Sequence, residues 1–376
     1  LKLKTYFFIP TLTILLALSL KSHSQTEAAD SIPADVDFKN LSFAIYPAVG
    51  YTPETSLQLG IIGFAVIKDA DKKSSAFYRP TSISPYFLYT LNNQIITAID
   101  LDVFFKSGLN LNSKIRYYNY PDFFYGIGNS NELADEEIYT NKYVRLDGRL
   151  LKPLSDKIFV GINYNFQNNG LSKFEEGGLL SMNEYRGEEG GWCNGLGLSL
   201  LYDSRNSTLY PTQGGLVRLG FITYSNIFGS DYRYTSFLID IRKFRKIVNE
   251  KNIIGWQANF NLTSGENIPF YNLNKIGGDD KLRGIENSNL YIDRQAWYTQ
   301  VEYRRDLFWR LGAVIFAGIG DVADNLDDFN LSETKYVVGV GGRFQALKNE
   351  KFNIRLDIGM ARHGQSAFYL SIREAF

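Results

Sequence analysis

The sequence has few of the residues on which covalent cross-links, metal centres and polyanion binding depend. Its 376 residues include one cysteine, Cys193, and two histidines. A single cysteine permits no internal disulfide, and so few sulfur and imidazole groups cannot build a structural metal site. We therefore expect no metal and no cofactor. The 40 basic and 40 acidic side chains cancel, so nothing in the charge balance argues for nucleic acid as a partner.

Long apolar runs are also scarce. Residues 7–20 form a mostly apolar run that follows Lys2 and Lys4, and Ser22 and Ser24 supply small residues for cleavage before Gln25. A transmembrane helix is the alternative, but the run is shorter than the roughly 20 residues that a span needs. The sequence therefore predicts a cleaved signal peptide over 1–24. No later segment has a run of 18 apolar residues, so we expect no helical span.

Aromatic residues, in contrast, are plentiful and make up 15% of the chain. Such a content is typical of membrane β-barrels, which carry aromatic girdles at both membrane interfaces. Apolar and polar residues also alternate through many segments. Near the C-terminus, Ile354, Leu356 and Ile358 alternate with Arg355 and Asp357. Because successive residues of a strand point to opposite faces, this pattern predicts strands with one apolar and one charged face.

A soluble sandwich would show the same alternation. The signal peptide, apolar faces that run for about 8–10 residues and the mixture of acids and bases on the polar faces favour a membrane barrel. Closure of the sheet leaves no unpaired edge in lipid. We predict an all-β fold, a transmembrane antiparallel β-barrel of 16 strands over 43–376, with 14 or 18 strands as alternatives. A short periplasmic segment, 25–42, precedes it, and 128–141 and 168–191 are expected as extracellular loops.

The end of the chain also favours a membrane barrel. Phe368, Leu370, Ile372 and Phe376 are expected to share one apolar face of the last strand, and Phe376 is the terminal residue. A last strand that ends in an aromatic residue resembles the signal by which outer-membrane barrels are delivered for assembly. Glu374 interrupts this apolar face and is expected at the membrane interface.

Several short motifs then follow one another in a characteristic order and spacing. They are Tyr51-Thr52-Pro53-Glu54-Thr55 near the start, Tyr120-Pro121-Asp122, Asp203-Ser204-Arg205 with Pro211 and Gly214, Arg283-Gly284-Ile285 in the segment 264–293, and Glu302-Tyr303-Arg304. Together they resemble the BamA/TamA superfamily (bacterial surface antigen) of outer-membrane assembly proteins. The resemblance covers nearly the whole chain beyond the signal peptide, and it implies a long loop folded into the barrel lumen.

The resemblance also implies partners for the loop arginine. In the family this arginine is held by an acid that matches Glu302 and by an aspartate on the following strand. We predict an ion pair between Arg283 and Glu302, because Glu302 faces the lumen and guanidinium groups bind carboxylates. The chain departs from the family at the second position, where Gly318 stands. The loop is then held either by Glu302 alone or also by another acid, such as Asp279 or Asp357.

Two classes of function follow from these observations. By resemblance, the protein assists insertion or translocation of outer-membrane proteins in the bacterial outer membrane. Only 25–42 precede the first expected strand, which is too short for the POTRA domains of the family. We therefore expect a POTRA-less member that depends on a periplasmic, lipoprotein or POTRA-bearing partner. The alternative is a passive barrel, namely a channel, a structural subunit or a surface-exposed binding protein.

An enzymatic role is not expected. His363 is the only histidine beyond the signal peptide, and it lies in a short polar turn with Ser366. A catalytic serine needs a histidine within hydrogen-bond reach and a third orienting group. The sequence has no Gly-x-Ser-x-Gly motif to provide that arrangement.

Overall fold

The computed structural model describes residues 41–67, 81–105, 107–182, 185–346, 351 and 353–376. The predicted signal peptide, 1–24, and all but the last two residues of the segment 25–42 lie outside the described residues. Among the described residues, no helix has the length and apolar character required to cross a membrane.

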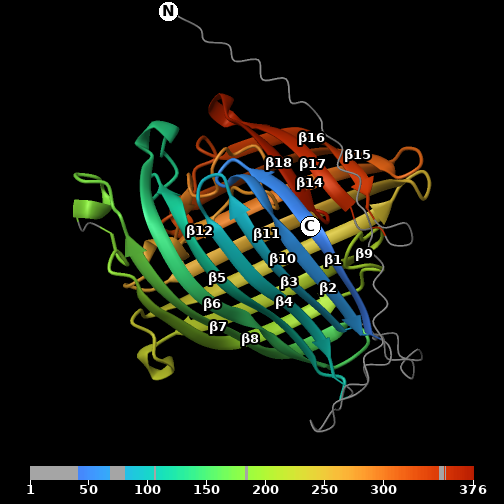
Figure 1. Ribbon diagram of the computed structural model, residues 1–376, viewed down its shortest axis with the longest axis horizontal. Coiled ribbons are helices and arrows are strands. Elements are labelled where there is room, and N and C mark those ends of the chain that lie inside the picture. Colours follow the sequence, from blue (N-terminus) through green and yellow to red (C-terminus); the bar gives the residue numbers. More distant parts are fainter. Residues whose placement is uncertain (1–40, 68–80, 106, 183–184, 347–350, 352) are drawn as a thin grey trace, which may run out of the picture. The chain divides into compact units, whose positions relative to one another are not determined.

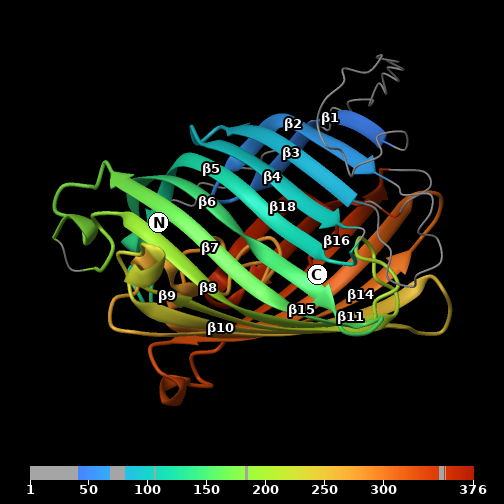
Figure 2. The ribbon, with the colours of Figure 1, turned by 90° about the horizontal axis from the view of Figure 1, so that it is seen from below.

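Sixteen antiparallel strands close into a barrel, as the sequence predicts (Figure 1). Each strand pairs with its neighbours along the chain, and the first strand meets the last. Figure 2 shows the barrel from below, where β5 to β10 run side by side. The strands are β1 (Leu41–Thr52), β2 (Ser56–Ile67), β3 (Thr81–Thr90), β4 (Ile95–Phe104), β5 (Asn110–Phe124), β6 (Glu137–Pro153), β7 (Ile158–Ser172), β8 (Gly191–Asp203), β9 (Gly214–Tyr224), β10 (Tyr234–Lys246), β11 (Asn252–Ser264), β14 (Gln295–Asp306), β15 (Leu311–Ala323), β16 (Lys335–Gln345), β17 (Asn353–Ala361) and β18 (Ser366–Ile372).

Two short strands and several single turns of 3₁₀-helix lie outside the wall sheet. The strands β12 (Asn274–Lys275) and β13 (Ile292–Asp293) pair with each other inside the segment between β11 and β14. The 3₁₀ turns are η3 (Leu133–Asp135), η4 (Leu180–Met182), η5 (Asn226–Phe228), η6 (Phe270–Asn272), η7 (Leu326–Asp328) and η8 (Arg362–Gly364).

The connections between strands differ at the two ends of the barrel. The loops 125–136, 173–190 and 265–294 emerge at one end, whereas the turns 154–157 and 307–310 and the C-terminus lie at the other. Long loops face the outside and short turns face the periplasm in barrels of this kind. The two loops are shorter than the predicted extracellular loops 128–141 and 168–191, because β6, β7 and β8 extend into those ranges.

The expected alternation is realised in the wall. Along β17, Ile354, Leu356 and Ile358 are exposed on the outside, and Arg355 and Asp357 are buried on the inside. This arrangement gives the barrel an apolar outer surface and a charged interior, as a lipid-embedded barrel requires.

The C-terminus corrects one prediction. The last strand ends at Ile372, and Arg373 adopts a positive φ of 67° that turns the chain inward. Phe376 is therefore buried in the lumen and does not continue the outer face of the strand. Its ring centroid lies 6.0 Å from that of Phe244, and its carbonyl oxygen accepts a 2.9 Å hydrogen bond from Arg304 Nη2.

The remaining residues of the predicted C-terminal signal stay on the last strand. Phe368, Leu370 and Ile372 alternate with the buried Ala367 and Tyr369, so they lie on the outer face. Glu374 also points inward and not to the membrane interface, because Arg343 Nε donates a 2.8 Å hydrogen bond to its carboxylate. A buried cation thus draws the end of the chain away from the lipid face.

Candidate functional site

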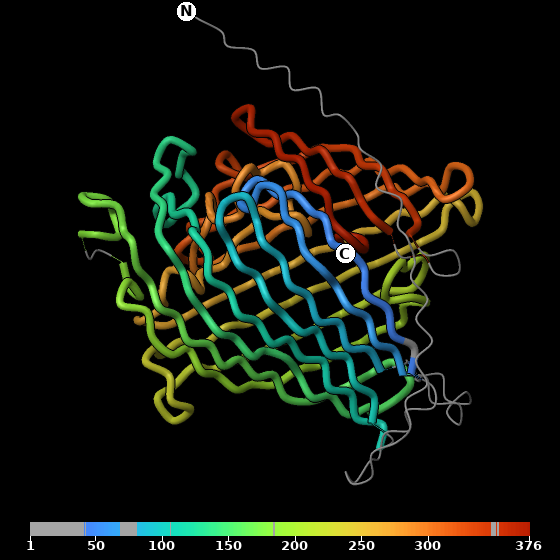
Figure 3. The backbone as a smooth tube through the Cα atoms, in the orientation of Figure 1, coloured from blue at the N-terminus to red at the C-terminus, as the bar shows by residue number. Residues whose placement is uncertain are grey.

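The tip of the loop between β11 and β14 is docked inside the barrel (Figure 3). Arg283 lies at this tip and has no solvent exposure. Its Nη2 forms the predicted ion pair with Glu302 of β14, and its Nη1 donates a 2.8 Å hydrogen bond to Asp357 of β17. The guanidinium also lies 3.8 Å from the ring centroid of Phe316, which adds a cation–π contact.

The two acids that hold Arg283 belong to a larger buried ion cluster. Glu302 also accepts a 2.8 Å hydrogen bond from Arg304, and Asp357 accepts bonds of 2.6 Å from Arg343 and 2.9 Å from Arg355. Buried charges are tolerated only when they are paired and hydrogen-bonded, so each member depends on the others. The cluster comprises Asp279, Arg283, Glu302, Arg304, Arg343, Arg355, Asp357 and Glu374.

A second acid does hold the loop, and it is Asp357, one of the residues named as alternatives. Asp279 instead pairs with Arg355, at 2.6 Å. Gly318, which stands where the family has its aspartate, fulfils a different role. A Cβ at this position would lie 2.7 Å from Leu282 Cδ2, so a larger residue would force the leucine of the loop to shift.

Two further glycines let the loop tip approach the wall closely. A Cβ on Gly359 of β17 would lie 2.0 Å from the carbonyl oxygen of Arg283. Gly284 has a φ of 140°, a conformation that other residues rarely adopt. A Cβ on Gly284 would lie 3.0 Å from the backbone atoms of Met360. Sequence analysis identified Gly284 but did not identify Gly359. The only sequence feature that could have indicated its role is that a small residue stands on the inward face of a strand.

Apolar contacts complete the docking of the loop. Leu282, Ile285 and Leu290 are fully buried, and they pack with Tyr298 of β14 and Val322 of β15 in one hydrophobic cluster. A buried leucine or isoleucine contributes about 1.5–3 kcal/mol relative to exposure. Ile285, the third residue of the predicted motif, is therefore an anchor of the docked loop.

The docked loop also contacts both sides of the junction between the first and last strands. Glu54, in the turn between β1 and β2, accepts a 2.7 Å hydrogen bond from the backbone N–H of Ser288. On the other side, the hydroxyl of Tyr369 in β18 donates a 3.0 Å bond to the carbonyl oxygen of Ile285. Burial raises the pKa of the Glu54 carboxyl above its ordinary value. The role of Glu54 was missed, although the residue lies in a motif recognised in the sequence.

The junction itself is weakly paired. Among the described residues, one pair, Tyr51 and Leu370, joins β1 to β18. Twelve pairs join β1 to β2, and seven join β17 to β18. The ring centroids of Tyr51 and Phe368 lie 5.3 Å apart, which adds one aromatic contact between the two strands. We call this junction the seam.

The motif of Asp203, Arg205, Pro211 and Gly214 lies elsewhere. It forms the connection between β8 and β9, at the end of the barrel opposite to the long loops. Arg205 Nη2 donates a 2.9 Å bond to Asp203, and Gly214 has a φ of 91° beside the carbonyl oxygen of Ser204. The motif therefore shapes a turn, and the structure does not bring it into the Arg283 cluster.

Comparisons with known proteins agree with this architecture. The model of the Omp85 superfamily domain matches residues 83–376, whereas no curated protein matches the chain. BamA from Haemophilus ducreyi lacking POTRA domains 1–3 superimposes with a TM-score of 0.59 and 15% identity, over 89% of this chain and 70% of that one. CdiB from Acinetobacter baumannii gives a TM-score of 0.58 and 11% identity, over 89% and 60%.

A second CdiB, from Escherichia coli, has a TM-score of 0.56 and 10% identity, over 87% of this chain and 62% of that one. The chain thus spans less than two thirds of the length of both CdiB structures. At these identities the structural matches show a common barrel fold, and the family model extends over most of the sequence. The docked arginine loop, the closed barrel of 16 strands and the family match together show that this chain belongs to the Omp85 superfamily.

Proposed function

We propose that this protein assists the insertion or translocation of proteins at the bacterial outer membrane, together with a partner that brings it substrate. The observation that carries the proposal is the seam, which is joined by one residue pair. Every other neighbouring pair of wall strands is joined along most of its length. The seam is therefore the place where the wall opens at the lowest cost.

An opened seam offers a surface that an incoming strand can use. Residues 41–49 of β1 pair with β2 on one side and have no ladder partner in β18. Such an edge presents N–H and C=O groups that an extended segment can bind by strand addition. Leu41, Phe43 and Ile45 are exposed on the outer face of this edge, where they suit contact with lipid. A membrane β-sheet to which strands are being added needs both the unpaired backbone groups and the apolar outer face.

The family supports the same role in coarser form. The superfamily model matches most of the chain, and Omp85 barrels are outer-membrane proteins that work with other assembly components. We infer that this chain resides in the outer membrane and is recruited by a periplasmic, lipoprotein or POTRA-bearing partner. Purification from native membrane in mild detergent, followed by identification of bound proteins, tests the partner directly.

Locking the seam tests the function. Tyr51→Cys and Leu370→Cys, in a Cys193→Ala background, place two thiols on the paired residues of the seam. If the seam must open, oxidation should abolish the activity and reduction should restore it. The readout is the abundance of other outer-membrane barrels in cells that depend on the variant.

A second disulfide, placed between two well-paired strands, serves as the control for the seam disulfide. Val340→Cys and Ile358→Cys join β16 to β17, where the strands are already well paired. This control should leave the activity unchanged in both redox states. Full activity of the oxidised seam variant, with the disulfide verified by mass spectrometry, would contradict the proposal.

The passive channel remains the alternative, and the docked loop disfavours it. Arg283, Leu282 and Ile285 occupy the lumen and are fully buried. A channel would show steady conductance in planar bilayers that rises when 277–287 are deleted. We also propose that the protein is not an enzyme, because His363 lies in the exposed turn η8 and carries a φ of 63°.

A further inference from the structure

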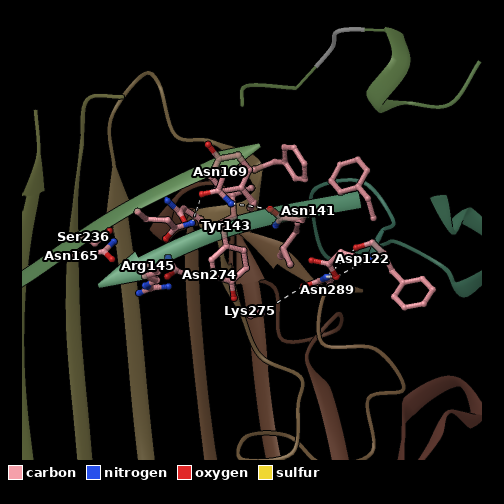
Figure 4. A pocket seen from close by; sticks show the side chains of 18 of the residues that line it. Asp122, Asn141, Tyr143, Arg145, Asn165, Asn169, Ser236, Asn274, Lys275 and Asn289 are labelled. Carbon is pink, nitrogen blue, oxygen red and sulfur yellow. Dashed lines mark hydrogen bonds between the residues drawn. The ribbon is translucent and has the colours of Figure 1, made fainter. Parts of the chain in front are cut away.

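A cavity of about 400 Å³ lies between the docked loop and the opposite wall, at the extracellular end of the lumen (Figure 4). Its walls come from the ends of β5, β6, β7 and β9 to β11 and from the loop residues around Lys275 and Asn289. The volume falls within the range of small-molecule sites. The cavity is separate from the seam and from the Arg283 cluster, so it calls for its own explanation.

Side-chain amides form an ordered chain along one wall of this cavity. Gln167 Nε2 donates a 2.5 Å hydrogen bond to Asn169 Oδ1, and Asn169 Nδ2 donates a 3.0 Å bond to Asn141 Oδ1. Asn165 Nδ2 donates a 2.8 Å bond to the hydroxyl of Tyr224. The bonds fix these amides in place and use their N–H groups as donors.

Two acceptors in this array have no partner. Asn165 Oδ1 and Gln167 Oε1 are buried atoms without a hydrogen bond, and their residues are 2% and 4% exposed. Buried polar atoms are nearly always hydrogen-bonded, so each exception needs an explanation. The missing partner must be a donor such as a hydroxyl or a water molecule.

The charged groups of the cavity are, in contrast, already paired or hydrogen-bonded. Arg145 lines the cavity, and its Nε lies 3.1 Å from Asp147 Oδ1 in an ion pair. Lys275 Nζ donates a 2.9 Å bond to Asn289 Oδ1, and Lys281 Nζ donates a 2.9 Å bond to the carbonyl oxygen of Lys275. Asp122 accepts a 2.7 Å bond from Asn289. Among the described residues, no cluster of His, Cys, Asp and Glu could hold a metal ion. The acceptors left free belong to neutral amides, which suit neither an anion nor a metal.

Aromatic rings provide the second element of the site. Tyr224 and Tyr234 both line the cavity and stack with a centroid distance of 4.1 Å and an interplanar angle of 14°. The hydroxyl of Tyr234 accepts a 2.9 Å bond from Asn272, so it is held in place. Tyrosine combines an apolar ring with a polar end, and it therefore suits ligands that combine C–H and O–H groups.

We propose that this cavity binds a neutral saccharide of one or two sugar units. Sugar hydroxyls would donate to Asn165 Oδ1 and Gln167 Oε1, and the C–H faces of the ring would pack on the tyrosines. An apolar ligand would leave the two acceptors unpaired, and a charged one would find no free counter-charge. Because Lys281 and Asn289 belong to the docked loop, a bound sugar also stabilises the loop in place.

The test uses the full chain purified in an amine-oxide detergent, because detergents with sugar head groups would compete. Glucose, galactose, N-acetylglucosamine, maltose and lactose are titrated by calorimetry and by saturation-transfer difference NMR. Inorganic phosphate and a triglycine peptide serve as comparison ligands. At least one sugar should bind saturably and raise the unfolding temperature, and the two comparison ligands should not.

Variants then locate the binding. Asn165→Leu with Gln167→Leu removes both free acceptors and should weaken binding about tenfold or more. Asn163→Leu is the control, because Asn163 lies on the same face of β7 but outside the cavity, and it should change the affinity less than twofold. If the double variant does not fold, Ser236→Phe fills the cavity and should abolish binding. Absence of saturable sugar binding, stronger binding of phosphate or peptide, or equal loss in the Asn163 control would overturn the proposal.

Discussion

Arg283 Nη1 donates a 2.8 Å hydrogen bond to Asp357 Oδ2, although 74 positions separate the two residues in the sequence. The same guanidinium pairs with Glu302, so one side chain joins the loop to β14 and to β17. Since β17 adjoins β18, the bond ties the loop to the wall next to the seam. The docked loop is therefore part of what holds the barrel closed.

Replacing the loop arginine should destabilise the barrel strongly. Arg283→Met leaves Glu302 and Asp357 buried without their shared cation, and breaking a buried ion pair costs about 3–5 kcal/mol. Urea unfolding in lipid vesicles measures this change in the free energy of unfolding. Arg294→Met is the control, because its pair with Asp324 is exposed and should contribute at most about 1 kcal/mol. Equal effects of the two variants would show that the buried cluster does not stabilise the fold.

A side chain at Gly359 should displace the loop. Gly359→Val would place its Cβ 2.0 Å from the carbonyl oxygen of Arg283, and neither backbone can move aside cheaply. We expect trypsin to cut at Lys281 in this variant and to spare it in the unmodified protein. Gly342→Val is the matched control, because a Cβ there meets no atom within 4 Å. Protection of Lys281 in both variants would contradict close docking of the loop.

The terminal phenylalanine should behave as a core residue. Phe376 is 4% exposed and packs on Phe244 under Arg304, so Phe376→Ala should lower the free energy of unfolding by about 3 kcal/mol. Phe368→Ala, on the outer face of β18, should cost less because its side chain is only partly buried. Urea unfolding of both variants gives the comparison. A larger loss for Phe368→Ala would argue that Phe376 leaves the lumen.

Stability should depend on pH through Asp293, a residue of the loop hairpin. Burial raises the pKa of its carboxyl from 3.8 to about 6 in the folded protein. Between these values the unfolded chain has lost its proton while the folded protein keeps it. The contribution of Asp293 to stability is therefore complete below pH 3.8, falls as the pH rises and is lost above about pH 6.

Asp293→Asn removes this titration and should flatten the pH dependence of the unfolding temperature between pH 4 and 6. Thermal unfolding followed by circular dichroism measures the effect. Asp327→Asn, in the exposed turn η7, is the control and should leave the curve of the unmodified protein unchanged. A curve for Asp293→Asn with the original slope would place the titrating group elsewhere.

Local patterns were enough to predict the wall of the barrel. The alternation around Ile354 and Arg355 indicated which side chains face lipid and which face the lumen, because this alternation follows from strand geometry alone. The same parity placed Glu302 in the lumen, and the resemblance supplied Arg283 as its partner. The ion pair between Arg283 and Glu302 could thus be predicted before any tertiary contact was known.

Other features depend on contacts between distant parts of the chain. Sequence analysis left open whether Glu302 alone or also another acid, such as Asp279 or Asp357, holds the loop, and it placed Phe376 on the outer face of the last strand. Arg373 turns the chain inward there because Arg304 and Arg343 bind the terminal segment from other strands. The free acceptor of Asn165 likewise reflects which groups meet across the lumen.

By itself, the sequence determined that this protein is a β-barrel with a charged interior and an arginine loop, because strand alternation and short motifs are properties of neighbouring residues. Only the tertiary structure decided that Asp357 completes the arginine site, that one residue pair joins the seam, and that a cavity lined by amides lies behind the loop. Barrel closure brings together residues that lie far apart along the chain. The local alternation of residues does not indicate which distant residues meet, so these contacts can be identified only in the closed barrel.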